Sequence, residues 1–207
     1  MGTGRDGPSG PRLGGHAGQF AGFVEPLVAR GFRAVALDLP GHGSSRRSLS
    51  SLRHFATAIA HAGELFAPLA GLVAHSFGSA ASTYAISRGL AARRAVFLAP
   101  PAGFETFLLR MRRGLGWSDE VERRFRRMSE SWLRLKFDEA EPRFLAPAID
   151  LPLLVVHDRG DDEVAFEEGE ELARRWPGAR LEATEGLGHH RPLREAAVIE
   201  RAVGFLA

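Results

Sequence analysis

Short apolar runs alternate with segments of helical periodicity along most of this 207-residue chain. The runs lie at residues 32–39, 71–74, 94–99, 151–157 and 179–184. Apolar runs of this length, bounded by Gly or Pro, are typical of strands buried on both faces of a parallel sheet. The helical segments between and around them lie at residues 20–28, 51–65, 77–88, 166–176 and 192–206. This alternation predicts one domain with a doubly wound, mostly parallel α/β sheet.

Two parts of the chain depart from the alternation. Residues 1–13 are rich in Gly, Pro and Arg and lack apolar periodicity, so we predict irregular structure there. Residues 102–147 have helical apolar spacing and are predicted to form a helical insertion over the sheet. The arginines of this insertion are interleaved with acidic residues such as Asp119, Glu120 and Glu122. That mixture favours a solvated helix face over a nucleic-acid surface.

The composition excludes several kinds of site and leaves the ligand open. The chain has no cysteine, which excludes disulfides and thiolate metal sites. It has no apolar run long enough to span a membrane, and its N-terminus lacks the apolar centre of a secretory signal. We therefore expect a cytoplasmic protein with no membrane and no nucleic-acid partner. A formal net charge of +2 selects no ligand.

A serine, an aspartate and a histidine each follow one of the predicted strands. Ser76 lies in AHSFG, Asp161 in HDRGDDEV and His189 in EGLGHH. Because the carboxyl ends of parallel strands meet at one edge of the sheet, the loops after these strands can converge. A serine hydroxyl becomes a nucleophile when an imidazole takes its proton and a carboxylate fixes the tautomer of that imidazole. The three residues therefore predict a site for nucleophilic catalysis.

Each of these residues also has an ordinary structural interpretation. Ser76 could cap the helix that follows it, and Asp161 or Asp162 could cap the next one. Asp162 is also a rival for the acid, one position along the chain. His189 on its own could be a core or surface histidine. Asp158, Asp161 and Asp162 have no second cluster of ligands to complete a cation shell, so we predict no metal and no cofactor.

Taken together, the motifs resemble the serine-hydrolase type of the α/β-hydrolase superfamily. AHSFG is similar to the nucleophile elbow of that family, with Ala74 where the common pattern has Gly. HDRGDDEV resembles the acid loop and aligns Asp161 with the acid position. GLGHHRPL resembles the histidine loop and selects His189 over His190, while His75 is expected to belong to loop structure. The resemblance implies an α/β-hydrolase sheet in which residues 102–147 form a short helical cap.

The resemblance also implies an activity. It points to a serine hydrolase that cleaves carboxylic esters or thioesters of small to medium apolar substrates, with Phe77 N–H donating to the oxyanion. A catalytically silent homologue that acts as a binding protein is the alternative, and a non-hydrolytic member such as a cofactor-free haloperoxidase or a lyase is a third. The apolar residues of the cap that could line a pocket are Phe104, Phe107, Leu108, Trp117, Phe125 and Trp132.

The beginning of the chain departs from the family pattern. LGGHAGQF aligns with a His-Gly-x-Gly-Gly turn, but Pro11 and Arg12 stand in place of His-Gly, and Leu13 stands at the second oxyanion donor. No strand-like run precedes Leu13, although the family's third strand lies between the fourth and the fifth. We therefore expect the N-terminal strands to be missing, in a short variant or an N-terminally truncated product. Such a chain should have an incomplete oxyanion hole and weak activity.

Overall fold

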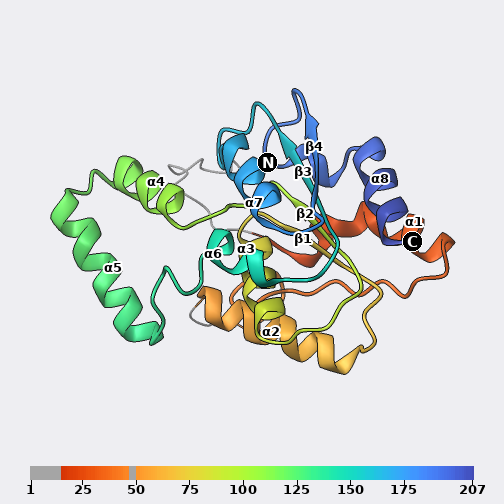
Figure 1. Cartoon of the computed structure of the whole chain (residues 1–207), viewed down its shortest axis with the longest axis horizontal. Coiled ribbons are helices and arrows are strands. Elements are labelled where there is room, and N and C mark those ends of the chain that lie inside the picture. The colour runs from red at the N-terminus through yellow and green to blue at the C-terminus, as the bar shows by residue number, and fades with distance from the viewer. Residues whose placement is uncertain (1–14, 47–49) are drawn as a thin grey trace, which may run out of the picture.

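A parallel sheet forms the centre of the molecule (Figure 1). The computed structural model describes residues 15–46 and 50–207. Within them, the sheet has four strands in the order β1-β2-β3-β4, and each neighbouring pair is parallel. The strands are β1 (Leu72–His75), β2 (Ala95–Leu98), β3 (Leu153–Asp158) and β4 (Arg180–Thr184). Four predicted strands are thus confirmed to within two residues at each end, and the predicted α/β fold class is confirmed.

Helices flank this sheet in the order that the sequence periodicity predicts. The helices that match predicted segments are α1 (Ala21–Ala29), α2 (Leu52–Leu65), α3 (Phe77–Ser87), α7 (Phe166–Arg175) and α8 (Ala196–Leu206). Residues 102–147 contain α4 (Glu105–Leu115), α5 (Asp119–Leu133) and α6 (Pro142–Leu145). Short 3-10 turns lie at η1 (Ala17–Phe20), η2 (Ala146–Ala148) and η3 (Arg191–Leu193). None of the helices in the described ranges is long and apolar enough to cross a membrane.

The central strands are apolar throughout because both of their faces are covered. Successive side chains of a strand point to opposite faces. Val96 and Leu154 pack in one buried cluster with residues of α1 and α8, and Phe97 and Val155 pack in a second cluster with Leu172 of α7. Every residue of β2 and β3 is buried. Parallel pairing of these strands brings the loops after β1, β3 and β4 to the same edge.

The prediction of a strand at residues 32–39 is wrong. The structure assigns no strand there, and Val35 and Leu37 are 49% and 40% exposed. A strand needs a neighbour that exchanges backbone hydrogen bonds with it. In the described part of the chain, β1 pairs with β2 alone, and no strand pairs with its other edge. An apolar run without a pairing neighbour therefore stays outside the sheet.

Helices α4 and α5 of the cap segment project away from the sheet (Figure 1). No residue of α5 is buried, and Met128 and Trp132 are 62% and 56% exposed. Several of its arginines are paired with acidic residues, as in the Arg123–Glu120 ion pair at 2.9 Å. This pairing agrees with a solvated helix face. The cap is helical, as the periodicity predicts. Helix α5 has no buried side chain, whereas Leu108 of α4 and Phe104 and Leu135 next to the helices are buried.

Candidate active site

Ser76 occupies a one-residue turn between β1 and α3. Its backbone has φ 51° and ψ −129°, which is a strained conformation for a residue with a side chain. Ser76 lies at the N-cap position of α3, but its side chain makes no capping hydrogen bond. The interpretation of Ser76 as an ordinary helix cap is therefore not supported. The turn instead holds the hydroxyl at the carboxyl edge of the sheet.

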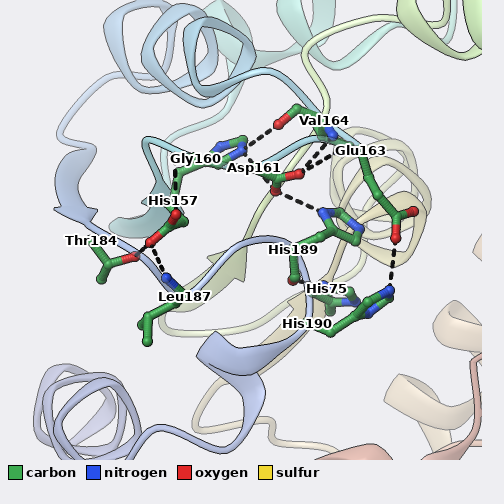
Figure 2. A network of polar contacts seen from close by, with 11 residues as sticks. His75, His157, Gly160, Asp161, Glu163, Val164, Thr184, Leu187, His189 and His190 are labelled. Carbon is green, nitrogen blue, oxygen red and sulfur yellow. Dashed lines mark hydrogen bonds and ion pairs between the residues drawn. The ribbon is translucent and has the colours of Figure 1, made fainter.

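Asp161 and His189 are in direct contact (Figure 2). Asp161 Oδ2 lies 2.7 Å from His189 Nδ1, and Asp161 Oδ1 accepts hydrogen bonds from the N–H groups of Glu163 and Val164. Burial alone would raise the pKa of Asp161. The hydrogen bonds from His157, His189 and the Val164 N–H outweigh burial and hold the pKa of this carboxyl well below its usual range.

This contact sets the tautomer of His189. An ionised carboxylate can only accept hydrogen bonds, so Nδ1 of His189 must donate and Nε2 must carry the lone pair. His189 is 5% exposed and is the general-base candidate, with Nε2 pointing away from Asp161. The rival acid, Asp162, is exposed. The geometry thus favours Asp161 over Asp162, and the catalytic role of Asp161 stays a prediction.

Two residues at the end of β3 support this pair, and neither was expected to have a role in the site. His157 is fully buried, with Nε2 2.9 Å from the Val164 carbonyl and 3.3 Å from Asp161 Oδ2. Asp158 Oδ2 accepts hydrogen bonds from the Thr184 hydroxyl and the Leu187 N–H, both at 2.9 Å. Asp158 therefore ties the end of β3 to the loop that carries His189. The sequence feature that could have identified them is their position directly at the end of the predicted strand, in HDRGDDEV.

The pKa of Asp158 reflects the same arrangement. Burial alone would raise it, but the N–H groups of Leu187, Gly188 and Gly160 and the Thr184 hydroxyl donate to the carboxylate. These hydrogen bonds outweigh burial and lower the pKa. Asp158 is therefore an ionised anchor for the histidine loop.

His75 links the nucleophile turn to the histidine loop. Its Nε2 lies 2.9 Å from the carbonyl oxygen of His189, although 114 residues separate the two. Burial, together with the nearby His189 and His190 rings, lowers the pKa of His75 to about 4. His75 is therefore a neutral imidazole at neutral pH and donates Nε2–H to that carbonyl. The expectation that His75 merely belongs to loop structure misses this link.

The site is partly assembled. The loops after β1, β3 and β4 carry Ser76, Asp161 and His189 at one edge of the sheet. The hydrogen bonds of the described residues include none between the Ser76 hydroxyl and His189. Catalytic hydrogen bonds are often long without substrate, so this does not exclude a role for Ser76. Phe77, the proposed oxyanion donor, is the first residue of α3, and Leu13 lies outside the described residues.

Aromatic residues near the nucleophile turn come from α3 and the start of the cap. The Phe77 and Phe104 rings are 6.2 Å apart, and Phe104 is 6% exposed. Trp117 packs on Phe125 at 5.0 Å within the projecting α4–α5 part. Trp132 is exposed. Of the apolar cap residues expected to line a pocket, Phe104 and Leu108 are buried, and the Phe104 ring contacts the residue after Ser76.

Comparison with known families accords with this geometry. A family model described as the alpha/beta hydrolase family matches residues 10–202. The chain belongs to this family. Membership supports a hydrolase in general terms and specifies neither substrate nor mechanism. No curated protein matches the chain.

Solved structures share the fold at low sequence identity. A bromoperoxidase from Bacillus anthracis has a TM-score of 0.71 and 17% identity, with 92% of this chain and 87% of that chain covered. A meta-cleavage product hydrolase from Pseudomonas fluorescens has a TM-score of 0.67 and 17% identity, with 92% and 85% covered. A thermophilic esterase from Thermogutta terrifontis has a TM-score of 0.64 and 18% identity, with 92% and 84% covered. At such identities these likenesses show the fold alone.

Proposed function

We propose that this alpha/beta hydrolase is a serine hydrolase that cleaves carboxylic ester or thioester bonds of small to medium apolar substrates. The observation that carries the proposal is the 2.7 Å contact between Asp161 and His189, at the sheet edge that also holds Ser76. The strained turn at Ser76 adds to it, because the hydroxyl there satisfies no helix cap. Strained backbone of this kind recurs at catalytic sites.

The chemistry follows from the tautomer of His189. Ser76 Oγ attacks the acyl carbon while its proton passes to His189 Nε2, and the resulting imidazolium is stabilised by ionised Asp161. The N–H of Phe77 faces the charge that develops on the carbonyl oxygen. His189 then gives the proton to the departing alcohol or thiol, which leaves an acyl-enzyme. Water activated by His189 hydrolyses this ester and restores the Ser76 hydroxyl.

The apolar character of the substrate is inferred from the aromatic side chains next to the nucleophile. Phe104 touches both Phe77 and Phe137, with ring centroids 6.2 Å and 5.5 Å apart. Such rings favour an apolar acyl or alcohol group over a charged one. A panel of nitrophenyl esters of increasing acyl length measures this preference. Faster hydrolysis of charged acyl groups than of apolar ones would contradict the substrate class.

A fluorophosphonate probe tests the nucleophile directly, because it forms a covalent bond only with an activated serine. The wild type should be labelled at Ser76, and Ser76→Ala should not be. Ser79→Ala is the matched control, since Ser79 lies one turn further along α3 and its buried hydroxyl has no hydrogen-bond partner. Labelling should persist in Ser79→Ala.

A silent homologue that only binds ligands is the second candidate. The missing hydrogen bond between Ser76 and His189 favours it. The same probe decides between the two functions. Absence of labelling in the folded wild type, or labelling that persists in Ser76→Ala, would overturn the serine-hydrolase proposal.

A further inference from the structure

Three histidines meet beside the nucleophile turn, one from the end of β1 and two from the loop after β4 (Figure 2). One ring nitrogen from each of His75, His189 and His190 lies within 4.8 Å of the other two. We propose that they bind a divalent transition-metal ion of the zinc class, and that the bound ion blocks hydrolysis. The binding stands on the geometry alone. The block rests on the proposed function of Ser76 and His189.

The spacing of the rings is close to that of a metal site. The ring centroids are 4.6 Å apart for His75 and His189, 4.9 Å for His189 and His190, and 5.7 Å for His75 and His190. Tetrahedral zinc with bonds of about 2.0–2.1 Å places its nitrogen ligands roughly 3.3–3.4 Å apart. Nitrogens within 4.8 Å of one another must therefore approach by about 1.5 Å at most to bind one ion. The His190 side chain is 61% exposed, so it can swing inward and gives the ion a route from solvent.

The hydrogen bonds on the far side of each ring match those of metal ligands. His75 Nε2 donates to the His189 carbonyl at 2.9 Å, and His189 Nδ1 donates to Asp161 at 2.7 Å. His190 Nε2 lies 2.8 Å from a carboxylate oxygen of Glu163. Metal-bound histidines nearly always donate their second N–H to a carboxylate or carbonyl in this way. The nitrogens that remain are Nδ1 of His75, Nε2 of His189 and Nδ1 of His190.

The donor set selects the kind of ion. Three neutral imidazoles suit Zn²⁺, Cu²⁺ or Ni²⁺, whereas Mg²⁺ and Ca²⁺ require oxygen ligands. The carboxylates of Asp161 and Glu163 lie one ring away and offset part of the charge of the ion. Three protein ligands leave a fourth position for water. The proposed site departs from the expectation of no metal, which was drawn from Asp158, Asp161 and Asp162 and not from these histidines.

Occupancy of the site removes the general base. The lone pair on His189 Nε2 is the one that takes the Ser76 proton, and coordination uses that same lone pair. Metal binding at His189 Nε2 and proton transfer to the same nitrogen therefore exclude each other. The ion acts as a reversible inhibitor.

Zinc binding to the full chain measures the site without reference to activity. We expect equilibrium dialysis against Zn²⁺ to give one bound ion, and Co²⁺ to give the visible absorption of a tetrahedral site. His190→Gln and His75→Gln should each weaken binding at least tenfold, and Glu163→Gln should weaken it by about tenfold. His61→Gln is the matched control, because His61 is 81% exposed on α2 and should leave the affinity unchanged. Binding undiminished in both His75→Gln and His190→Gln, or no binding of Zn²⁺ to the wild type, would overturn the site.

The rate of fluorophosphonate labelling at Ser76 then tests the block. Zn²⁺ at a saturating concentration should slow labelling of the wild type at least tenfold, and a chelator should restore it. In His190→Gln the same Zn²⁺ concentration should slow labelling much less, relative to that variant's own metal-free rate. Zinc binding without any labelling would support the site and overturn the hydrolase. Labelling at full rate with zinc bound would overturn the block.

Discussion

The interior strand β3 and the edge strand β1 differ in how completely they are built. All six residues of β3 are buried, and β3 pairs with a strand on each side. The edge strand β1 has four residues, of which only Ala74 is buried, and within the described residues it pairs on one side only. In the apolar segment at residues 32–39, Val35 and Leu37 are exposed.

This difference divides the proposed catalytic residues. The acid follows β3 and the base follows its neighbour β4, and Asp158 and His157 at the end of β3 fix their loops. The nucleophile follows the edge strand β1 and is joined to the base through the His75 side chain. We infer that the interior strand β3 sets the position of the Asp161–His189 pair, whereas Ser76 is positioned by an edge strand.

The largest expected effect concerns the acid, Asp161, which follows the interior strand β3. Asp161→Asn should lower turnover by on the order of 10⁴, because an asparagine no longer selects the His189 tautomer with a free Nε2. Asp162→Asn should change turnover little, since Asp162 is exposed. The measurement is kcat on the best ester of the panel. Equal losses of turnover in both variants, or a loss in Asp162→Asn alone, would contradict the assignment of Asp161 as the acid.

The second prediction compares an apolar residue of β3 with one in the segment at residues 32–39. Leu154 of β3 is 2% exposed, and Leu37 is 40% exposed. Leu154→Ala should lower the free energy of unfolding by roughly 2–5 kcal/mol, through lost burial and a cavity. Leu37→Ala should lower it by less than about 1 kcal/mol. Chemical denaturation measures both. A cost at Leu37 as large as that at Leu154 would show that residues 32–39 are packed against a partner.

The same contrast explains how far the sequence could predict the fold. The runs that became β2 and β3 were found because their burial on both faces leaves an uninterrupted apolar pattern. The run at residues 32–39 has that pattern too, but an apolar pattern shows only that a segment is compatible with a buried strand. Whether a neighbouring strand is there to pair with it depends on the rest of the chain. The strand predicted at residues 32–39 failed for this reason.

The candidate site shows a similar limit. Ser76, Asp161 and His189 were found because each stands after a strand within a recognisable motif. The roles of His75, which is half-buried, and His157, which is buried, were not found, because such a histidine acts through a partner distant in sequence or through the shape of a loop. The helical apolar spacing of residues 102–147 showed a helix face that includes Trp132, but not what that face contacts. The second oxyanion donor, Leu13, stays a prediction outside the described residues.

The third prediction tests the anchor of the histidine loop. Asp158→Asn places an amide N–H₂ where the carboxylate accepts backbone N–H groups, and should cost about 1–3 kcal/mol of stability at neutral pH. Asp162→Asn, at an exposed position, should stay within about 0.5 kcal/mol of the wild type.

The pH dependence of stability gives this prediction a sign. The pKa of Asp158 is lower in the folded protein than in the unfolded chain, where it has the ordinary value of 3.8. Its contribution is therefore fully present above that value and is lost as the pH falls toward the folded pKa. Asp158→Asn should flatten the loss of stability below about pH 4. An unchanged acid limb in Asp158→Asn would contradict the assignment of Asp158 as an ionised anchor.

The smallest expected effect tests the backbone strain at the nucleophile turn, Ser76, which follows the edge strand β1. Ser76 has φ 51°, a region that glycine enters without steric cost, so Ser76→Gly should be more stable than Ser76→Ala by about 1 kcal/mol. Ser87, the last residue of α3, is the control because its backbone is helical. There the order should reverse, with Ser87→Gly less stable than Ser87→Ala by roughly 0.5–1 kcal/mol. Thermal unfolding of the four variants measures both differences. If glycine destabilises position 76 as it does position 87, the turn stores no strain. Ser76 would then lose its strained backbone as support for a nucleophile, and its place at the sheet edge that holds Asp161 and His189 would be the remaining observation.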